Sequence, residues 1–303
     1  MSTAVEVIAI FGPTAAGKTA VADEVAAILG TDVVSADAMQ VYRGLPILTN
    51  QPERATRLVA FRALDQEMSV GEFAALAHAE VDELVGRRGT AVVAGGTGLY
   101  LRAALADLDV PPSVPADARV RISHEVDADP EAGHRRLSQL DPTTSASVHP
   151  NDRKRLVRAL ELAELGRSLV RGQTGLWSEE TRRPTLVVGL EVPSQELEAR
   201  IRTRTRSMFD RGVVAEVRSA LERPISRTAA KTLGLDEIAQ LSPDDALEQI
   251  VARTRRYAAY QRKWMRRIPG LVTVDANRPP TEVAAEIAAR ATRGADDPRA
   301  RDE

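Results

Sequence analysis

The chain of 303 residues is long enough for about two domains, and its hydrophobic fraction of 43% is sufficient for a buried core. It contains no cysteine, which excludes disulfide bonds and cysteine-ligated metal sites. No apolar run approaches the roughly 18–20 residues that cross a bilayer, and the N-terminus lacks a basic and then hydrophobic signal pattern. We therefore expect a cytoplasmic protein with no membrane partner.

Charge is distributed unevenly along the chain, although the net charge is only −2. Residues 200–270 contain 16 Lys and Arg against 8 Asp and Glu, so this stretch carries +8 and the remainder carries −10. Such a basic region is typical of a protein whose partner is a polyphosphate. Arg-rich helices that simply face solvent give the same pattern, so charge alone leaves both interpretations open.

The first 110 residues alternate between short apolar strands and amphipathic helices. Strands are predicted at 5–11, 32–35 and 91–94, and helices at 19–29 and 69–87. This alternation predicts an α/β fold built on a doubly wound parallel sheet.

The first predicted strand runs directly into a P-loop, Gly12-Pro13-Thr14-Ala15-Ala16-Gly17-Lys18-Thr19, which matches the pattern GxxxxGK[ST]. Glycines let backbone N–H groups and the following helix N-terminus surround phosphate oxygens. Lys18 adds a positive charge, and the Thr19 hydroxyl can hold Mg²⁺. Because an ordinary glycine turn rarely has this full context, we expect a phosphorylated ligand.

Polar residues follow the second predicted strand. Asp37 lies just beyond its end, where parallel sheets place their ligands, with Ser35, Gln40, Tyr42 and Arg43 nearby. Its carboxylate could hold a metal through water or act as a general base. The structural alternative is a helix cap or an Asx-turn, and the local sequence leaves both open.

The third predicted strand ends in a second glycine-rich turn, Gly95-Gly96-Thr97-Gly98. Its glycines allow a close approach of backbone to ligand, and Thr97 can donate to a phosphate oxygen. No acidic residue ends this strand, so the Walker-B carboxylate is absent and a motor ATPase or GTPase fits poorly.

The alternation stops between Pro111 and Pro184, where the sequence is typical of helices and loops. We predict a helical insertion over 111–184 that divides the α/β core into a first part, 1–110, and a second part, 185–293. In the second part, strands are predicted at 185–190 and 271–275 and a last helix at 280–293; residues 294–303 are predicted to be a disordered tail.

Basic residues gather on several predicted helices. Arg153, Lys154, Arg155 and Arg158 crowd a helix start, where positive charge is unfavourable, so an anionic partner and a solvated face are equal alternatives. Further along, Arg200 and Arg204 share one helical face, and Arg202 and Arg206 lie nearly opposite. Residues 255–264 interleave basic and aromatic side chains, which suits base stacking. Tyr257 and Trp264 fit a helical core face equally well, and for Trp264 the core interpretation is favoured.

Taken in order, these motifs closely resemble those of the tRNA dimethylallyltransferase (isopentenyl-tRNA transferase) family over residues 5–270. The set consists of GPTAAGKT at 12–19, SADAMQVYR at 35–43, GGTGLY at 95–100, His149–Asp152 with Arg158–Glu161, and Arg256–Ala258 with Gln261 and Trp264. Segments 48–52, 61–65 and 233–237 depart from the usual family sequence.

The resemblance implies transfer of a dimethylallyl group from dimethylallyl diphosphate to N6 of an adenine. That adenine lies on the 3′ side of the anticodon, at tRNA position 37, and the reaction releases diphosphate. The P-loop would then bind diphosphate, with Mg²⁺ as cofactor near Thr19. Asp37 would accept the adenine proton, Thr97 would lie beside base and diphosphate, and Arg204 would bind the diphosphate.

The same resemblance implies contact with the tRNA anticodon stem-loop. The contacting residues would be Asp37, Ala38, Met39 and Gln40 and, in the helical insertion, Lys154, Arg155, Leu156, Val157 and Arg158. We expect a monomer.

Other functions use parts of the same pattern. A small-molecule or nucleotide kinase also has a P-loop fold, and a related enzyme class prenylates free AMP-like nucleotides, for which a helical insertion is superfluous. A non-catalytic RNA-binding protein with a vestigial P-loop is a third alternative. The intact set of Gly17, Lys18, Thr19, Asp37 and Thr97 argues against such decay.

Overall fold

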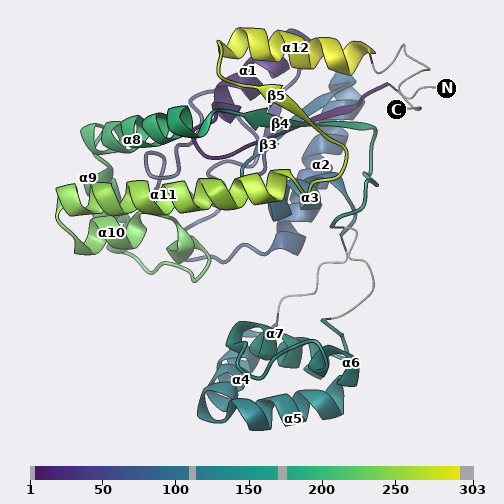
Figure 1. Ribbon diagram of the computed structural model, residues 1–303, viewed down its shortest axis with the longest axis vertical. Coiled ribbons are helices and arrows are strands. Elements are labelled where there is room, and N and C mark those ends of the chain that lie inside the picture. Colours follow the sequence, from purple (N-terminus) through teal and green to yellow (C-terminus); the bar gives the residue numbers. More distant parts are fainter. Residues whose placement is uncertain (1–3, 109–113, 170–175, 294–303) are drawn as a thin grey trace. The chain divides into compact units, whose positions relative to one another are not determined.

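One parallel five-stranded sheet forms the centre of the α/β part of the molecule (Figure 1). The computed structural model describes residues 4–108, 114–169 and 176–293, so the predicted tail at 294–303 lies outside the described residues. The strands are β1 (Val7–Phe11), β2 (Val33–Ser35), β3 (Ala91–Gly95), β4 (Thr185–Glu191) and β5 (Leu271–Asp275), in the spatial order β2-β3-β1-β4-β5. Every neighbouring pair is parallel, which confirms the predicted α/β fold with a parallel sheet.

Helices lie on both faces of this sheet, and others extend beyond it. The helices of this part are α1 (Lys18–Leu29), α2 (Val70–Arg88), α3 (Gly98–Leu105), α8 (Ser194–Asp210), α9 (Val213–Leu221), α10 (Leu235–Gln240), α11 (Pro243–Met265) and α12 (Pro280–Arg293). Helices α1 and α12 pack together on one face, and α2 and α3 pack on the other (Figure 1). No helix in the described ranges is long and apolar enough to span a membrane.

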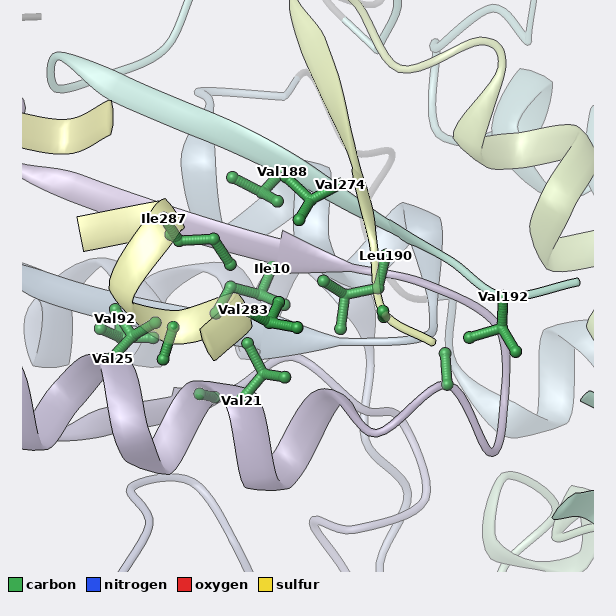
Figure 2. Packing of buried hydrophobic residues seen from close by; sticks show 14 of the residues in the cluster. Ile10, Val21, Val25, Val92, Val188, Leu190, Val192, Val274, Val283 and Ile287 are labelled. Carbon is green, nitrogen blue, oxygen red and sulfur yellow. The ribbon is translucent and has the colours of Figure 1, made fainter. Parts of the chain in front are cut away.

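Alternating side chains of β1 explain the packing on the α1–α12 face. Successive strand residues point to opposite faces, and Ile10, fully buried, lies beside Val21 of α1 and Val283 of α12 (Figure 2). Burial of one such aliphatic side chain contributes roughly 1.5–3 kcal/mol. This aliphatic core fixes β1 and α1 relative to each other, and therefore fixes the loop between them.

Strand register brings the loops after β1, β2 and β3 to one edge. Phe11 at the end of β1 pairs with Gly95 of β3 and with Gly189 of β4, and Ser35 of β2 pairs with Ala94. Since parallel strands all point the same way, the segments that follow them meet at the carboxyl edge of the sheet. The P-loop, the Asp37 segment and the Thr97 turn thus leave the sheet side by side.

A separate helical unit comprises residues 108–175. It contains α4 (Ala116–Ala128), α5 (Pro130–Leu140), α6 (Pro142–Ser145) and α7 (Arg153–Glu164). Its core includes Ile122, Leu137 and Leu160, all fully buried. Next to this core, the buried carboxylate of Glu161 forms ion pairs with Arg119 and Arg158.

The helical unit ends at Gly175, short of the predicted boundary at 184, and residues 176–184 belong to the α/β part. The reason is a buried arginine. Arg102 of α3 is 1% exposed, and its guanidinium donates to the carbonyl oxygens of Leu176 at 3.0 Å and Ser178 at 2.8 Å. These bonds tie the returning segment to the α/β core before β4 begins.

We expect Arg102→Met to loosen this segment while the apolar stem of the side chain is kept. The substitution leaves buried carbonyl groups without donors, at a cost of about 1–3 kcal/mol for each unsatisfied group. Thermal unfolding should show a lower Tm, and limited proteolysis should show new cleavage between residues 176 and 183. An unchanged Tm with unchanged cleavage would contradict this role of Arg102.

Candidate active site

The P-loop joins β1 to α1 in a conformation suited to anions. Ala15 and Gly17 have left-handed backbone conformations, with φ of 68° and 89°, and Gly17 is the N-cap of α1. The first-turn N–H groups of α1 therefore point toward the loop. Lys18 Nζ donates to the carbonyl oxygens of Gly12 at 3.0 Å and Pro13 at 2.9 Å, which holds the ammonium group over the loop.

Lys18 is half-buried, and its surroundings lower its pKa. Burial lowers its pKa to about 8, the Asp37 carboxylate acts in the opposite direction, and the Arg204 guanidinium lowers it further. A lowered lysine pKa means that the surroundings disfavour the ammonium form. Additional negative charge at this position would stabilise the ammonium form and raise the pKa of Lys18 again.

Asp37 makes the Asx-turn that the sequence left open. Its Oδ1 accepts a hydrogen bond from the backbone N–H of Met39 at 2.9 Å. This bond occupies one carboxylate oxygen and fixes the side chain at the carboxyl edge of the sheet. The Asx-turn is compatible with a role of Asp37 as a general base, because a general base has to be held in a fixed position.

Gln40 holds a neighbouring segment against the P-loop. Its Oε1 accepts from the Ser35 hydroxyl at 2.9 Å, and its Nε2 donates to the carbonyl oxygens of Thr49 and Asn50 at 3.3 and 2.9 Å. The side-chain amide is thus engaged within the protein. Thr49 and Asn50, which lie in the segment that departs from the family sequence, line the site as a result.

Gln261 of α11 links the two glycine-rich loops. Its Oε1 accepts from the backbone N–H of Thr14 at 2.7 Å, and its Nε2 donates to the carbonyl oxygen of Gly96 at 2.8 Å. A Cβ on Gly96 would overlap this amide, so the close approach depends on glycine. Gln261 is buried, and both of its hydrogen bonds are shielded from water.

Helix α8 presents two arginines to the site. Arg200 and Arg204 line the same cavity, whereas Arg202 faces away and pairs with Glu248, as the helical spacing predicts. Arg200 also pairs with Glu196. Arg204 has no ion-pair partner among the described residues. Burial lowers the pKa of Arg204 and the Asp37 charge raises it, so Asp37 compensates only part of the cost of holding this guanidinium away from water.

Two cavities adjoin at these residues. A P-loop cavity of about 350 Å³ is lined by the P-loop residues Thr14, Ala15, Gly17, Lys18 and Thr19 and by the polar side chains of Asn50 and Arg200. A larger cavity of about 530 Å³ has apolar walls from Leu48, Met208, Leu233 and Ile250. Both are lined by Thr14, Asp37, Thr49 and Arg204. Asp37 and Arg204 therefore stand between a phosphate-binding space and an apolar one.

Comparison with known proteins identifies the family. A family model described as IPP transferase matches residues 40–268, and one described as isopentenyl transferase matches residues 5–64. A tRNA dimethylallyltransferase of Corynebacterium jeikeium is 35% identical, over 94% of this chain and 96% of that protein. One from Kineococcus radiotolerans is 38% identical, over 88% and 89%. The chain belongs to the tRNA dimethylallyltransferase family.

Solved structures agree with this membership. The full-length tRNA isopentenylpyrophosphate transferase of Bacillus halodurans superposes with a TM-score of 0.67 at 26% identity, covering 95% of this chain and 97% of that one. A eukaryotic dimethylallyltransferase acting on tRNA shares the fold, with a TM-score of 0.73 at 24% identity over 90% and 74% of the two chains. The resemblance inferred from the motifs is confirmed, and the kinase alternative is not favoured.

The remaining predicted site residues take several positions in this tRNA dimethylallyltransferase fold. Thr97 is the N-cap of α3 and lines the larger cavity, where its Oγ1 lies 3.5 Å from the backbone nitrogen of Ala38. Ala38 and Met39 line the same cavity. Ala16 belongs to the P-loop itself, and its side chain is buried in the aliphatic core that contains Ile10 and Val21.

Tyr257 is a site residue that the motif analysis did not assign. It lines the larger cavity, and burial, together with the charge of Asp37, raises the pKa of its hydroxyl to about 12, against the effect of a hydrogen bond with Thr97. Arg256 and Lys231 line the same cavity. The alternation of basic and aromatic residues at 255–264 was the sequence signal for Tyr257, but it did not indicate which of these side chains face the cavity.

In the helical unit, two of the predicted tRNA contacts need correction. Leu156 and Val157 are 0% and 8% exposed and belong to the hydrophobic core of that unit, so their side chains are not available to RNA. Lys154 and Arg155 are exposed at the start of α7. Arg158 is half-buried against Glu161. The predicted contact surface therefore narrows to the basic side chains.

The lowered pKa of Lys18 gives a pH test with inorganic diphosphate. Below pH 8 the free protein holds the ammonium form that attracts the anion, and above pH 8 binding requires uptake of a proton. Affinity should therefore fall by up to about tenfold per pH unit above 8. Calorimetry in two buffers of different ionisation enthalpy should show uptake of about half a proton at pH 8 through Lys18.

Lys18→Met is the control, because diphosphate itself titrates in this range. We expect weaker binding by the variant and a shallower dependence on pH than in the wild type. Identical pH profiles for the two proteins would exclude Lys18 as the titrating group.

Proposed function

We propose that the chain transfers a dimethylallyl group from dimethylallyl diphosphate to N6 of the adenine at position 37 of tRNA, with release of diphosphate. The observation that carries this assignment is the position of Asp37 and Arg204 between a P-loop cavity and an apolar cavity. The first suits a diphosphate, and the second suits an isoprenoid and an adenine. We further propose a monomeric, cytoplasmic enzyme.

The donor diphosphate is held in this proposal by the P-loop and the two cations beside it. Backbone N–H groups, Lys18 and Arg204 are positioned before the substrate arrives, so they stabilise the charge that develops on the leaving oxygen. The allylic carbon tolerates loss of diphosphate because its positive charge is delocalised. Catalysis then depends on neutralising the leaving group.

The acceptor step forms the bond between adenine N6 and C1 of the dimethylallyl group, while the C1–O bond to diphosphate breaks. The exocyclic amine loses one proton, and the Asp37 carboxylate accepts it. An amine of this kind is a weak nucleophile, and a positioned base accelerates such a step by about 10²–10⁴-fold. Since the base must leave its stack to enter a cavity, an adenine in a single-stranded loop is the least costly acceptor.

Mg²⁺ is the proposed cofactor. The Thr19 hydroxyl lines the P-loop cavity, and no group of three His, Cys, Asp or Glu suited to a metal occurs in the described part of the chain. This donor set fits Mg²⁺, which proteins hold through one or two oxygen ligands together with substrate phosphates. Bound there, the ion would offset diphosphate charge beside Lys18.

The proposed reaction is tested by product analysis. Protein incubated with dimethylallyl diphosphate, Mg²⁺ and unmodified tRNA should yield dimethylallyl adenosine at position 37 on nucleoside mass analysis. Free AMP serves as a second acceptor, and we expect little transfer to it. Phosphorylation of a nucleoside by ATP without prenyl transfer would overturn the assignment in favour of a kinase.

Asp37→Asn separates the two roles of this side chain. Asparagine keeps the oxygen that accepts from the Met39 N–H but cannot take up the adenine proton. We expect turnover to fall by about 10²–10⁴-fold, with tRNA affinity and Tm near wild-type values. Turnover within a few-fold of wild type would reject Asp37 as the base.

Lys154→Ala combined with Arg155→Ala tests the basic surface of the helical unit. Removing two phosphate contacts should reduce the magnitude of the slope of log K for tRNA binding against log salt by about 1.4–1.8. The matched control is Arg153→Gln with Asp127→Asn, which removes an exposed ion pair on the same surface and leaves the net charge unchanged. Equal salt slopes in both double variants would contradict the proposed contact.

A further inference from the structure

A row of aromatic rings runs along α11, starting at the wall of the larger cavity. Tyr257 lines that cavity, and its ring centroid lies 6.5 Å from that of Tyr260 in a stacked arrangement. The Tyr260 ring lies 6.4 Å from Trp264, and Trp264 lies 4.9 Å from Trp177. The spacing of three and four residues along α11 places its three rings on one helical face.

Two rings of this row are open to solvent. Tyr260 is 54% exposed and Trp177 is 38% exposed. Trp264 is half-buried, because its indole packs so closely on Gly98 that a Cβ there would overlap the ring. A contiguous set of exposed aromatic side chains marks a binding surface more often than a packing defect.

Unpaired positive charge accompanies the rings. Within the described ranges, five basic residues on this part of the chain have no carboxylate partner. Arg262 is held by hydrogen bonds to the Ser194 hydroxyl and the Val192 carbonyl oxygen. The other four, which are called unpaired here, are Arg256, Lys263, Arg266 and Arg267. Two other arginines of α11 do have a carboxylate partner, since Arg253 pairs with Glu237 and Arg255 pairs with Glu198. The Arg267 guanidinium lies 4.0 Å from the centre of the Trp177 ring. Uncompensated cations thus coincide with the exposed rings.

We propose that this stacking surface, formed by Tyr260, Trp264 and Trp177 with the four unpaired cations, binds unpaired nucleotides of an RNA single strand. Bases stack on the rings, and the cations contact the phosphates, a combination that binds single strands with little sequence preference. The inference rests on the proposed function, because the row begins at the cavity that receives the adenine. It assigns to this surface the nucleotides that flank that adenine.

The charge favours RNA over a protein partner. The centre of a protein–protein interface is enriched in Tyr, Trp and Arg but is depleted of charged side chains as a whole, Lys among them. This surface instead places four uncompensated positive charges, one of them on Lys263, beside its rings. An RNA duplex is also a poor occupant, since its bases are already paired and stacked.

Intrinsic fluorescence gives a direct test, because the chain contains only two tryptophans and both lie in the stacking surface. The probe is an unmodified single-stranded RNA heptamer, compared with the same sequence as a duplex. We expect the single strand to quench tryptophan emission much more strongly than the duplex. Tyr260→Leu should raise Kd for the heptamer at least about fivefold, and Tyr260→Phe, which keeps the ring, should stay within about twofold of wild type.

Arg266→Gln and Arg255→Gln form a matched pair on the same stretch of chain. Only the first removes an unpaired cation, so only the first should weaken heptamer binding and reduce its salt dependence. Equal quenching by duplex and single strand, or an unchanged Kd for Tyr260→Leu, would overturn the proposal. So would capture of a protein partner that these substitutions abolish while heptamer binding persists.

Prenyl transfer to tRNA, measured on the same protein samples, separates the two claims. Normal transfer by wild type without heptamer stacking rejects the stacking surface and leaves the proposed reaction standing. Stacking with the expected variant pattern but without transfer rejects the reaction and upholds the surface.

Discussion

Lys18 and Arg204 place two half-buried positive charges beside one carboxylate, that of Asp37, and the site is organised around this imbalance. A cation removed from water costs several kcal/mol unless an opposite charge compensates it. For both residues burial lowers the pKa, and no second carboxylate pairs with either of them in the described residues. A diphosphate supplies the missing negative charge, so its binding relieves a cost that the folded chain already bears.

The parallel sheet and one buried amide keep these charges in place. Strand register brings the P-loop, the Asp37 segment and the Thr97 turn to the same edge, and Gln261 then joins two of them from α11 through hydrogen bonds to Thr14 and Gly96. Such bonds between buried groups are costly to break, because an unsatisfied donor or acceptor remains. Residues of α8 and α11 line the apolar cavity as well. The donor and acceptor sites are therefore held by the same elements of the fold.

The sequence was most informative where a structural feature depends on neighbouring residues. The P-loop, the parallel strands and the position of Asp37 follow from local patterns, since each is set by residues within one strand–loop–helix unit. The roles of Thr49 and Tyr257 could not be predicted, because they depend on contacts between distant segments. Burial of Leu156 and Val157 was missed for a related reason: the basic pattern at 153–158 hides the apolar face of the same helix. The boundary near 175 depends on the single buried side chain of Arg102.

In the proposed reaction, the P-loop of this protein holds the diphosphate that leaves. The P-loop of a kinase instead holds a nucleoside triphosphate, whose terminal phosphoryl group is transferred. The most direct measurement follows both products of one reaction, phosphorus species by ³¹P NMR and modified adenosine by mass analysis. We expect one inorganic diphosphate for each dimethylallyl adenosine formed, with no orthophosphate. Release of orthophosphate or of a nucleoside diphosphate, or prenylation without stoichiometric diphosphate, would contradict it.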